Sequence, residues 1–174
     1  NIDGINYYLD ASEKFLPFGE VPIRTLNGEA RIINFKKEGE WITLKPRKIT
    51  SKDINAKFTL SEEGIFKGKV AFKRAGYYAY EQREKIASMS EETYLDEFEE
   101  NHTDLEVENY SIKNKEDIHK TLIEVLDVKI SMNETLNKKH RINLFLFDRF
   151  KENPFKLKER TYPVDFAHPF KRNY

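Results

Sequence analysis

The chain has 174 residues, which is enough for one domain, or for one domain and a fragment of another, with a substantial core. Its 30 lysines and arginines balance 30 aspartates and glutamates, so the composition does not favour nucleic acid as a partner. Charged residues make up 34% of the chain, and no run approaches the roughly 20 apolar residues of a spanning helix, so we expect no transmembrane segment.

Cysteine is absent, which excludes disulfides and thiolate metal sites and leaves the redox compartment undetermined. The sequence shows no signal peptide. Aromatic residues make up 13% of the chain, and this enrichment favours a sheet-rich fold.

The first 28 residues contain aromatic, apolar and turn-forming stretches in close succession. Tyr7-Tyr8-Leu9-Asp10 is predicted to end a strand. Proline and glycine punctuate Phe15-Leu16-Pro17-Phe18-Gly19, which predicts an apolar loop, and Leu26-Asn27-Gly28 predicts a turn that leads onward.

Two hairpins are predicted after this segment. The stretches Ala30 to Phe35 and Trp41 to Leu44 flank a turn that ends in Gly39. In the second hairpin, apolar and polar residues alternate from Ile54 to Leu60 and again from Phe66 to Phe72. This alternation predicts a half-buried antiparallel pair with a lysine-lined outer face.

The residue pattern then changes to that of two short helices. The first is predicted from Tyr77 to Ala87, and the second from Thr93 to Asn101, because Ser88 and Glu91 have the spacing of a capping box. Residues 91–108 contain nine acidic residues and no lysine or arginine. A site for a cation or a basic partner is one interpretation, but we prefer a solvated helix face that runs into a strand. The basic segment from Lys138 to Arg172 would balance this acidic charge.

The remaining sequence returns to strands. These are predicted from Leu105 to Lys113, from Thr121 to Ser131, from Ile142 to Phe147 and, at a sheet edge, from Arg160 to Phe166. From Thr121 to Ser131 apolar residues occupy both odd-numbered and even-numbered positions, so they would point to both faces of a strand. This pattern predicts a bulge or burial on both faces. The whole pattern predicts a mainly β (α+β) fold, an antiparallel β-sandwich with two short helices inserted.

Both ends of the chain carry one resemblance. The segment with Asp10, Leu16-Pro17-Phe18-Gly19 and Asn27-Gly28 resembles the closing segment of transglutaminase-like cores in multidomain bacterial proteins. Near the other end, Asn153-Pro154-Phe155 and Arg160-Thr161-Tyr162-Pro163-Val164-Asp165-Phe166 resemble the signature of the domain of unknown function that follows such cores. The resemblance implies a core remnant and linker in residues 1–28, and a β-sandwich domain in residues 29–174 that continues beyond its last residue.

Asp10 is the one catalytic candidate that this resemblance supplies. In the family, this aspartate orients the histidine of a Cys-His-Asp triad, in which a thiolate attacks an acyl carbon. The chain has no cysteine and its four histidines all follow Asp10, so the resemblance implies a triad role only within a longer parent protein. The alternative is that Asp10 caps the turn at Ser12.

The resemblance implies a non-catalytic accessory module that buttresses a preceding transglutaminase-like domain or docks a partner. It also implies an exported protein in the periplasm or at the cell surface of a Gram-negative bacterium. The alternative function is a self-contained module that binds glycan or peptide through exposed aromatic side chains, namely Trp41, Tyr77, Tyr78 and Tyr80.

No cofactor is expected. His102 and Asp104 could supply two metal ligands, but no third histidine is close to them in the sequence, so a surface loop is the preferred interpretation.

Overall fold

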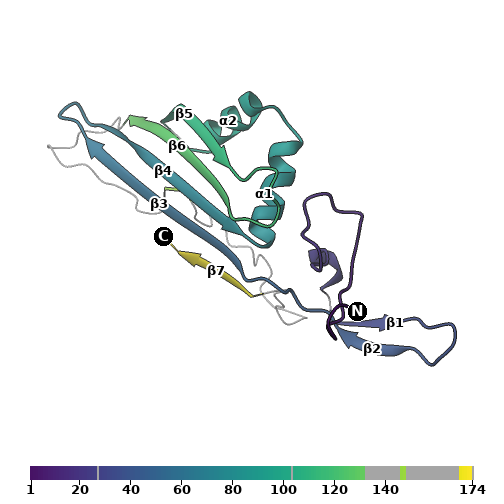
Figure 1. Ribbon diagram of the computed structural model, residues 1–174. Helices are drawn as coiled ribbons and strands as arrows, with labels where there is room; N and C mark the ends of the chain where they lie inside the picture. Colours follow the sequence, from purple (N-terminus) through teal and green to yellow (C-terminus); the bar gives the residue numbers. More distant parts are fainter. Residues whose placement is uncertain (27, 103, 132–145, 148–168, 174) are drawn as a thin grey trace, which may run out of the picture.

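The structure is a computed structural model that describes residues 1–26, 28–102, 104–131, 146–147 and 169–173 (Figure 1). Within these residues the chain is mainly β, as predicted, with its strands in two open sheets. The elements in chain order are η1, a short 3-10 helix (Ile23–Thr25), β1 (Glu29–Ile32), β2 (Glu40–Thr43), β3 (Thr50–Leu60), β4 (Ile65–Ala75), α1 (Tyr77–Ala87), α2 (Glu91–Glu100), β5 (Leu105–Lys113), β6 (Leu122–Ser131) and β7 (Phe170–Asn173).

The larger sheet has the strand order β5-β6-β4-β3-β7 (Figure 1). Four of its strands pair antiparallel, which agrees with the predicted hairpin connections. The edge strand β7, which the sequence did not predict, runs parallel to β3, with Phe170 opposite Thr50. The sheet is therefore mixed rather than wholly antiparallel.

The hairpin of β3 and β4 confirms the clearest alternation in the sequence. Ile54 lies opposite Phe72, and Phe58 lies opposite Gly68. A Cβ atom on Gly68 would lie 2.2 Å from the Lys57 carbonyl oxygen, so this position of the strand has no room for a side chain.

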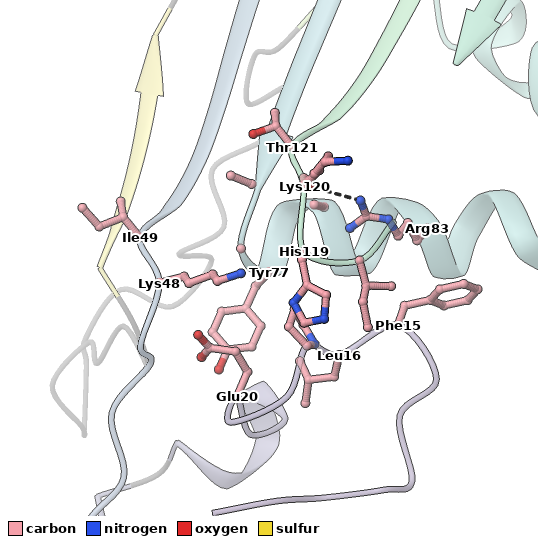
Figure 2. A pocket seen from close by; sticks show the side chains of 15 residues that line it. Phe15, Leu16, Glu20, Lys48, Ile49, Tyr77, Arg83, His119, Lys120 and Thr121 are labelled. Atoms are coloured by element: carbon pink, nitrogen blue, oxygen red, sulfur yellow. Dashed lines mark hydrogen bonds between the residues drawn. The ribbon is translucent and has the colours of Figure 1, made fainter. Parts of the chain in front are cut away.

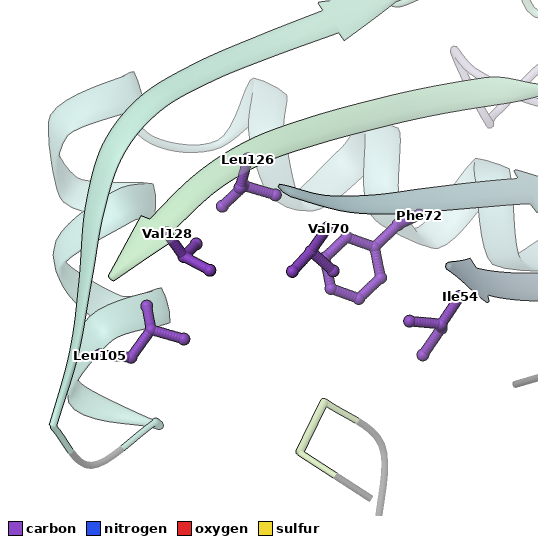
Figure 3. Packing of buried hydrophobic residues seen from close by; sticks show 6 residues of the cluster. All are labelled: Ile54, Val70, Phe72, Leu105, Leu126 and Val128. Carbon is purple, nitrogen blue, oxygen red and sulfur yellow. The ribbon is translucent and has the colours of Figure 1, made fainter. Parts of the chain in front are cut away.

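A core of apolar side chains covers one face of this sheet (Figure 3). Its buried members come from four strands: Ile54, Val70, Phe72, Leu105, Leu126 and Val128. Helix α2 packs Leu95 and Phe98 against this cluster, and Phe147 also contacts it. Burial of these side chains stabilises the pairing of strands that are distant in the sequence.

Both predicted helices are present, but the start of the second differs from the prediction. Helix α1 follows Gly76, whose φ of 60° and close approach to Thr50 favour glycine. Helix α2 begins at Glu91, and Ser90 is its N-cap, because the Ser90 Oγ accepts a hydrogen bond from the Thr93 amide at 3.1 Å. The predicted capping box at Ser88 is therefore wrong by two residues.

The two-sided apolar pattern of β6 has the predicted cause, burial on both faces. Leu122, Leu126 and Val128 are buried on one side, and Ile123 and Val125 are half-buried on the other. The irregular pairing lies in the partner strand, where the register of β5 shifts between Val107 and Asn109.

The N-terminal segment (residues 1–26) is not the end of a strand. Tyr7–Asp10 has no regular secondary structure, because these residues do not pair with any described strand, and the predicted strand is wrong. The segment lies beyond the end of the large sheet, next to α1 and the β1–β2 ribbon (Figure 1). Its apolar residues join α1 in a second core cluster that contains Leu16, Val21, Leu26, Tyr77 and Tyr80.

The described strands form one five-stranded sheet and a separate two-stranded sheet. They do not establish the predicted sandwich. The predicted strand from Arg160 to Phe166 lies outside the described residues. Of the predicted strand from Ile142 to Phe147, only Leu146 and Phe147 are described, and they lie in a bend.

Candidate functional site

Asp10 lies in a tight turn of the N-terminal segment. Its Oδ1 atom accepts hydrogen bonds from the Ser12 amide at 2.8 Å and the Ser12 hydroxyl at 2.5 Å. Its other oxygen lies 3.4 Å from an Arg24 nitrogen. The Ser12 hydrogen bonds and Arg24 lower the pKa of the Asp10 carboxyl, so it is ionised at neutral pH. Asp10 thus caps the turn at Ser12, and its triad role in a longer protein stays a prediction.

A chain of polar contacts connects this turn to helix α1. Arg24 pairs with Glu13, and the Glu13 carboxylate accepts a hydrogen bond from the Tyr80 hydroxyl at 2.7 Å. The Tyr80 and Arg24 hydrogen bonds lower the pKa of Glu13. Burial, together with the Glu13 contact, raises the pKa of Tyr80. The α1 helix therefore holds the residues that surround Asp10.

A second tyrosine of α1 holds the loop that follows. The Tyr77 hydroxyl donates a hydrogen bond of 2.7 Å to the Val21 carbonyl oxygen, and burial raises the pKa of Tyr77 to about 12. Next to it, Glu20 Oε2 accepts a 3.0 Å hydrogen bond from the Arg47 amide. These contacts fasten residues 20–21 both to α1 and to the segment before β3.

The same region contains a pocket of about 220 Å³ between the N-terminal segment, the start of α1 and the loop between β5 and β6 (Figure 2). Apolar side chains and a few charged ones line it, among them Leu16, Glu20, Lys48, Ile49, Ile118 and His119. Arg83 holds the loop in place, since its guanidinium donates hydrogen bonds to the carbonyl oxygens of Asn114, Lys115, Asp117 and Lys120.

The four aromatic side chains predicted to bind a ligand do not gather on one surface. Trp41 is 60% exposed on β2, with the Arg31 guanidinium over its ring. Tyr78 contacts β7 and accepts a hydrogen bond from Arg172. Tyr77 and Tyr80 are only 3% and 9% exposed, so the expectation that they are exposed is wrong. They are buried because the N-terminal segment covers α1, and of the four only Tyr77 lines the pocket.

A buried charge network between the large sheet and the helices was not predicted. Glu124 of β6 is fully buried and pairs with Arg74 of β4. It also accepts hydrogen bonds from Tyr94 at 2.7 Å, Tyr110 at 3.0 Å and Gln82 at 3.3 Å. Burial raises the pKa of both tyrosines, and Glu124 adds to the effect. With both oxygens satisfied, Glu124 has the contacts of a structural carboxylate rather than of a catalytic base.

The acidic stretch contributes surface ion pairs with lysines of neighbouring elements. Glu97 pairs with Lys85, Glu106 with Lys129, and Glu108 with Lys67. The basic segment expected to balance it lies mostly outside the described residues. Among those described, no group of three or more metal-ligating side chains occurs, and His102 packs against Phe98 with a 2.6 Å contact from Nδ1 to the Phe98 carbonyl oxygen.

No helix within the described part of the chain is long and apolar enough to cross a membrane. Comparisons with protein-family models, with curated proteins and with solved structures found no match for this chain.

Proposed function

We propose that residues 29–174 form a non-catalytic accessory module whose work is to hold the closing segment of a transglutaminase-like domain. The observation that carries the proposal is the attachment of the N-terminal segment to α1 through Tyr77 and Tyr80. Tyr80 binds Glu13, Glu13 pairs with Arg24, and Arg24 lies 3.4 Å from Asp10, so the module is connected to the surroundings of Asp10 through this chain of contacts.

The chemistry of these contacts fits a permanent structural attachment. The two rings pack among Leu16, Val21 and Leu26, and the Tyr77 hydroxyl bond is buried while that of Tyr80 is part-buried. Separating the segment from α1 would therefore expose apolar surface and leave the Val21 carbonyl oxygen unpaired. An attachment of this kind transmits mechanical support from the module to whatever domain precedes the segment.

The wider proposal follows the sequence resemblance. The five-stranded sheet is then one layer of a β-sandwich, Asp10 is the orienting member of a Cys-His-Asp triad in the parent protein, and residues 1–28 are the end of its core. The parent protein acts in the periplasm or at the surface of a Gram-negative bacterium, and this chain alone catalyses nothing.

The test uses the protein with its native upstream sequence. The double variant Tyr77→Phe, Tyr80→Phe removes the two hydroxyls that bind the segment. Loss of the buried Tyr77 bond costs about 1 to 3 kcal/mol, and loss of the part-buried Tyr80 bond costs less. We expect the Tm of the upstream domain to fall while the far-UV circular dichroism of the module is retained.

Tyr78→Phe is the matched control, because Tyr78 lies on the same helix but binds Arg172 of β7. It should leave the upstream domain unchanged. An upstream domain whose Tm is the same in the double variant and in the control would contradict the buttressing role.

Exposed Trp41 supports a second candidate, a glycan- or peptide-binding module. Its ring stacks under the Arg31 guanidinium, with 5.7 Å between the guanidinium carbon and the ring centroid, on a ribbon away from the large sheet. Trp41 is the only tryptophan, so its fluorescence reports this surface alone. A ligand-dependent shift across a glycan and peptide panel would support this candidate, and a flat response would remove it.

A further inference from the structure

The loop that joins β1 to β2 carries large apolar side chains in full contact with solvent. Phe35 is 100% exposed and Ile33 is 76% exposed, and they are the two most exposed large apolar side chains of the described residues. Trp41, on the adjoining strand β2, is 60% exposed. Single exposed apolar residues are ordinary, but three at one end of one hairpin indicate an interaction surface.

The ribbon of β1 and β2 points away from the large sheet, and its loop has a defined shape (Figure 1). The Lys36 amide donates a hydrogen bond of 2.9 Å to the Asn34 side-chain oxygen, which closes a tight turn around Phe35. At the base of the loop, a Cβ atom on Gly39 would lie 2.7 Å from the Ile32 carbonyl oxygen, so the chain approaches itself closely there. Phe35 is therefore presented by an ordered turn rather than by an irregular stretch of chain.

The other end of the ribbon is packed against the chain. Ala30 and Ile42 lie opposite each other and line a groove together with Tyr8 and Val21 of the N-terminal segment. Leu44, directly after β2, packs against the second core cluster. Because the ribbon is attached at this end, the loop is the part of it that projects into solvent.

Positive charge accompanies the apolar side chains of the loop. From Arg31 to Lys37 the chain carries three basic residues and no acidic one. Lys36 and Lys37 are exposed, and neither forms an ion pair with another described residue. Glu38 and Glu40 follow only where the chain returns to β2. Exposed apolar side chains beside cations match the surface of a membrane, where anionic headgroups cover an apolar layer.

The small size of the loop favours a lipid surface over a folded protein as the partner. A protein interface of standard size uses about 20 to 30 residues on each side, with central anchors that fill pockets. The stretch from Ile33 to Lys37 is too short for this, but each of its apolar side chains gains free energy by leaving water for a lipid layer. Tryptophan favours the boundary between headgroups and acyl chains, which suits the place of Trp41 behind the loop.

We propose that the loop between β1 and β2 binds the surface of a membrane that contains anionic lipids. Ile33 and Phe35 enter the apolar part of the headgroup region, Lys36 and Lys37 contact the lipid phosphates, and Trp41 lies at the boundary between the two. An anchor of this size holds the chain at the membrane reversibly, without crossing it.

Vesicle binding by the whole chain tests the proposal. Vesicles of phosphatidylcholine with about 30% phosphatidylglycerol are compared with vesicles of phosphatidylcholine alone. We expect at least about fivefold tighter binding to the anionic vesicles, because each basic residue near such a surface contributes about that factor. Trp41 is the only tryptophan, so its emission should shift to shorter wavelength on binding and should be quenched by lipids with brominated acyl chains.

The double variant Ile33→Ser, Phe35→Ser should weaken binding to the anionic vesicles by at least about tenfold, because two apolar side chains no longer leave water. Both positions are exposed, so the variant retains the fold. Leu60→Ser is the matched control, since Leu60 is an exposed apolar residue at the end of β3. It should bind as the unchanged chain does.

The double variant Lys36→Gln, Lys37→Gln should lose most of the preference for anionic over neutral vesicles, because it removes two of the three basic residues of the loop. Its matched control is Lys57→Gln, Lys73→Gln, which removes two exposed lysines of β3 and β4 and should keep the preference.

No binding to anionic vesicles, unchanged Trp41 emission on binding, or unchanged affinity in Ile33→Ser, Phe35→Ser would overturn the proposal. Light scattering of the chain without lipid adds a further test. A dimer that becomes a monomer in this double variant would also overturn the proposal, because a second copy of the chain would then cover the loop.

This inference goes beyond the accessory function and does not depend on it. Vesicle binding uses the present chain, whereas the accessory function is tested by the stability of an upstream domain, so either can fail without the other.

Discussion

At the scale of single residues, the buried carboxylate of Glu124 links the large sheet to both helices. It lies on β6 between the sheet and both helices, and it binds Arg74, Tyr94, Tyr110 and Gln82 at once. Breaking such a group leaves a buried charge without a partner, which costs more than the intact pair contributes. Glu124 therefore fixes how α1, α2 and the sheet meet.

Glu124→Ala should lower the free energy of unfolding by about 3 to 5 kcal/mol, because Arg74 would remain buried and unpaired. The double variant Arg74→Met, Glu124→Leu should cost less than Glu124→Ala alone. Urea denaturation measures all of these, with Glu106→Ala as the control, whose exposed pair with Lys129 is worth about 0 to 1 kcal/mol. Equal losses for Glu124→Ala and Glu106→Ala would show that the network does not hold the helices.

Tyr77 predicts a loss of stability at high pH. Burial raises its pKa from 10.0 to about 12, so between these values the unfolded chain releases the phenolic proton and the folded chain keeps it. The contribution of Tyr77 is therefore complete below pH 10 and is lost as the pH rises toward 12. Melting curves between pH 10 and pH 12 should show that the Tm of the unchanged chain falls as the pH rises. The Tm of Tyr77→Phe should fall less steeply over the same pH range. An equal slope in Tyr77→Phe would contradict a buried neutral phenol.

At the scale of elements, the two helices are separated by a short connection whose serines have different roles. Ser90 caps α2, whereas the Ser88 hydroxyl donates to the Lys85 carbonyl oxygen at the end of α1. The capping-box spacing pointed to Ser88, but a cap is decided by which hydroxyl faces the free amides of the first turn.

Ser90→Ala should cost about 1 kcal/mol of stability, because the Thr93 amide loses its acceptor. Ser88→Ala is the matched control and should cost less. Thermal or urea unfolding of the two variants measures both losses of stability. A larger loss for Ser88→Ala would show that Ser88, as the sequence predicted, is the capping residue of α2.

The elements show what local sequence can determine. The β3–β4 hairpin was predictable because apolar and polar residues alternate between Ile54 and Phe72, as they do in a strand with one buried face. Helix α1 was predictable because the spacing of residues changes there from two to three or four. The edge strand β7 was not, because it pairs with β3 from more than a hundred residues away. Nor were the Glu124 network and the Glu20–Arg47 contact, since each joins polar residues that carry no local pattern.

At the scale of the whole molecule, the N-terminal segment is part of the folded structure although it contains no strand. In the second core cluster, Leu16, Val21 and Leu26 of this segment pack against Tyr77 and Tyr80 of α1. Helix α1 in turn contacts β3 and β4 of the large sheet. The expectation of a strand at Tyr7–Asp10 failed because aromatic residues there pack against side chains, as Tyr7 does against Phe18 and Arg47. The central claim is that segment and module unfold together.

Native-state hydrogen exchange tests this claim most directly. The amides of Glu20, Thr25 and Leu26, which donate to carbonyl oxygens within the segment, should exchange with the same free energy as those of Val70 and Leu126 in the sheet. Leu16→Ala, which removes a buried side chain of the cluster, should lower both sets together. Rapid exchange of the segment amides beside a fully protected sheet would contradict the attachment, and with it the proposal that this module holds the residues around Asp10.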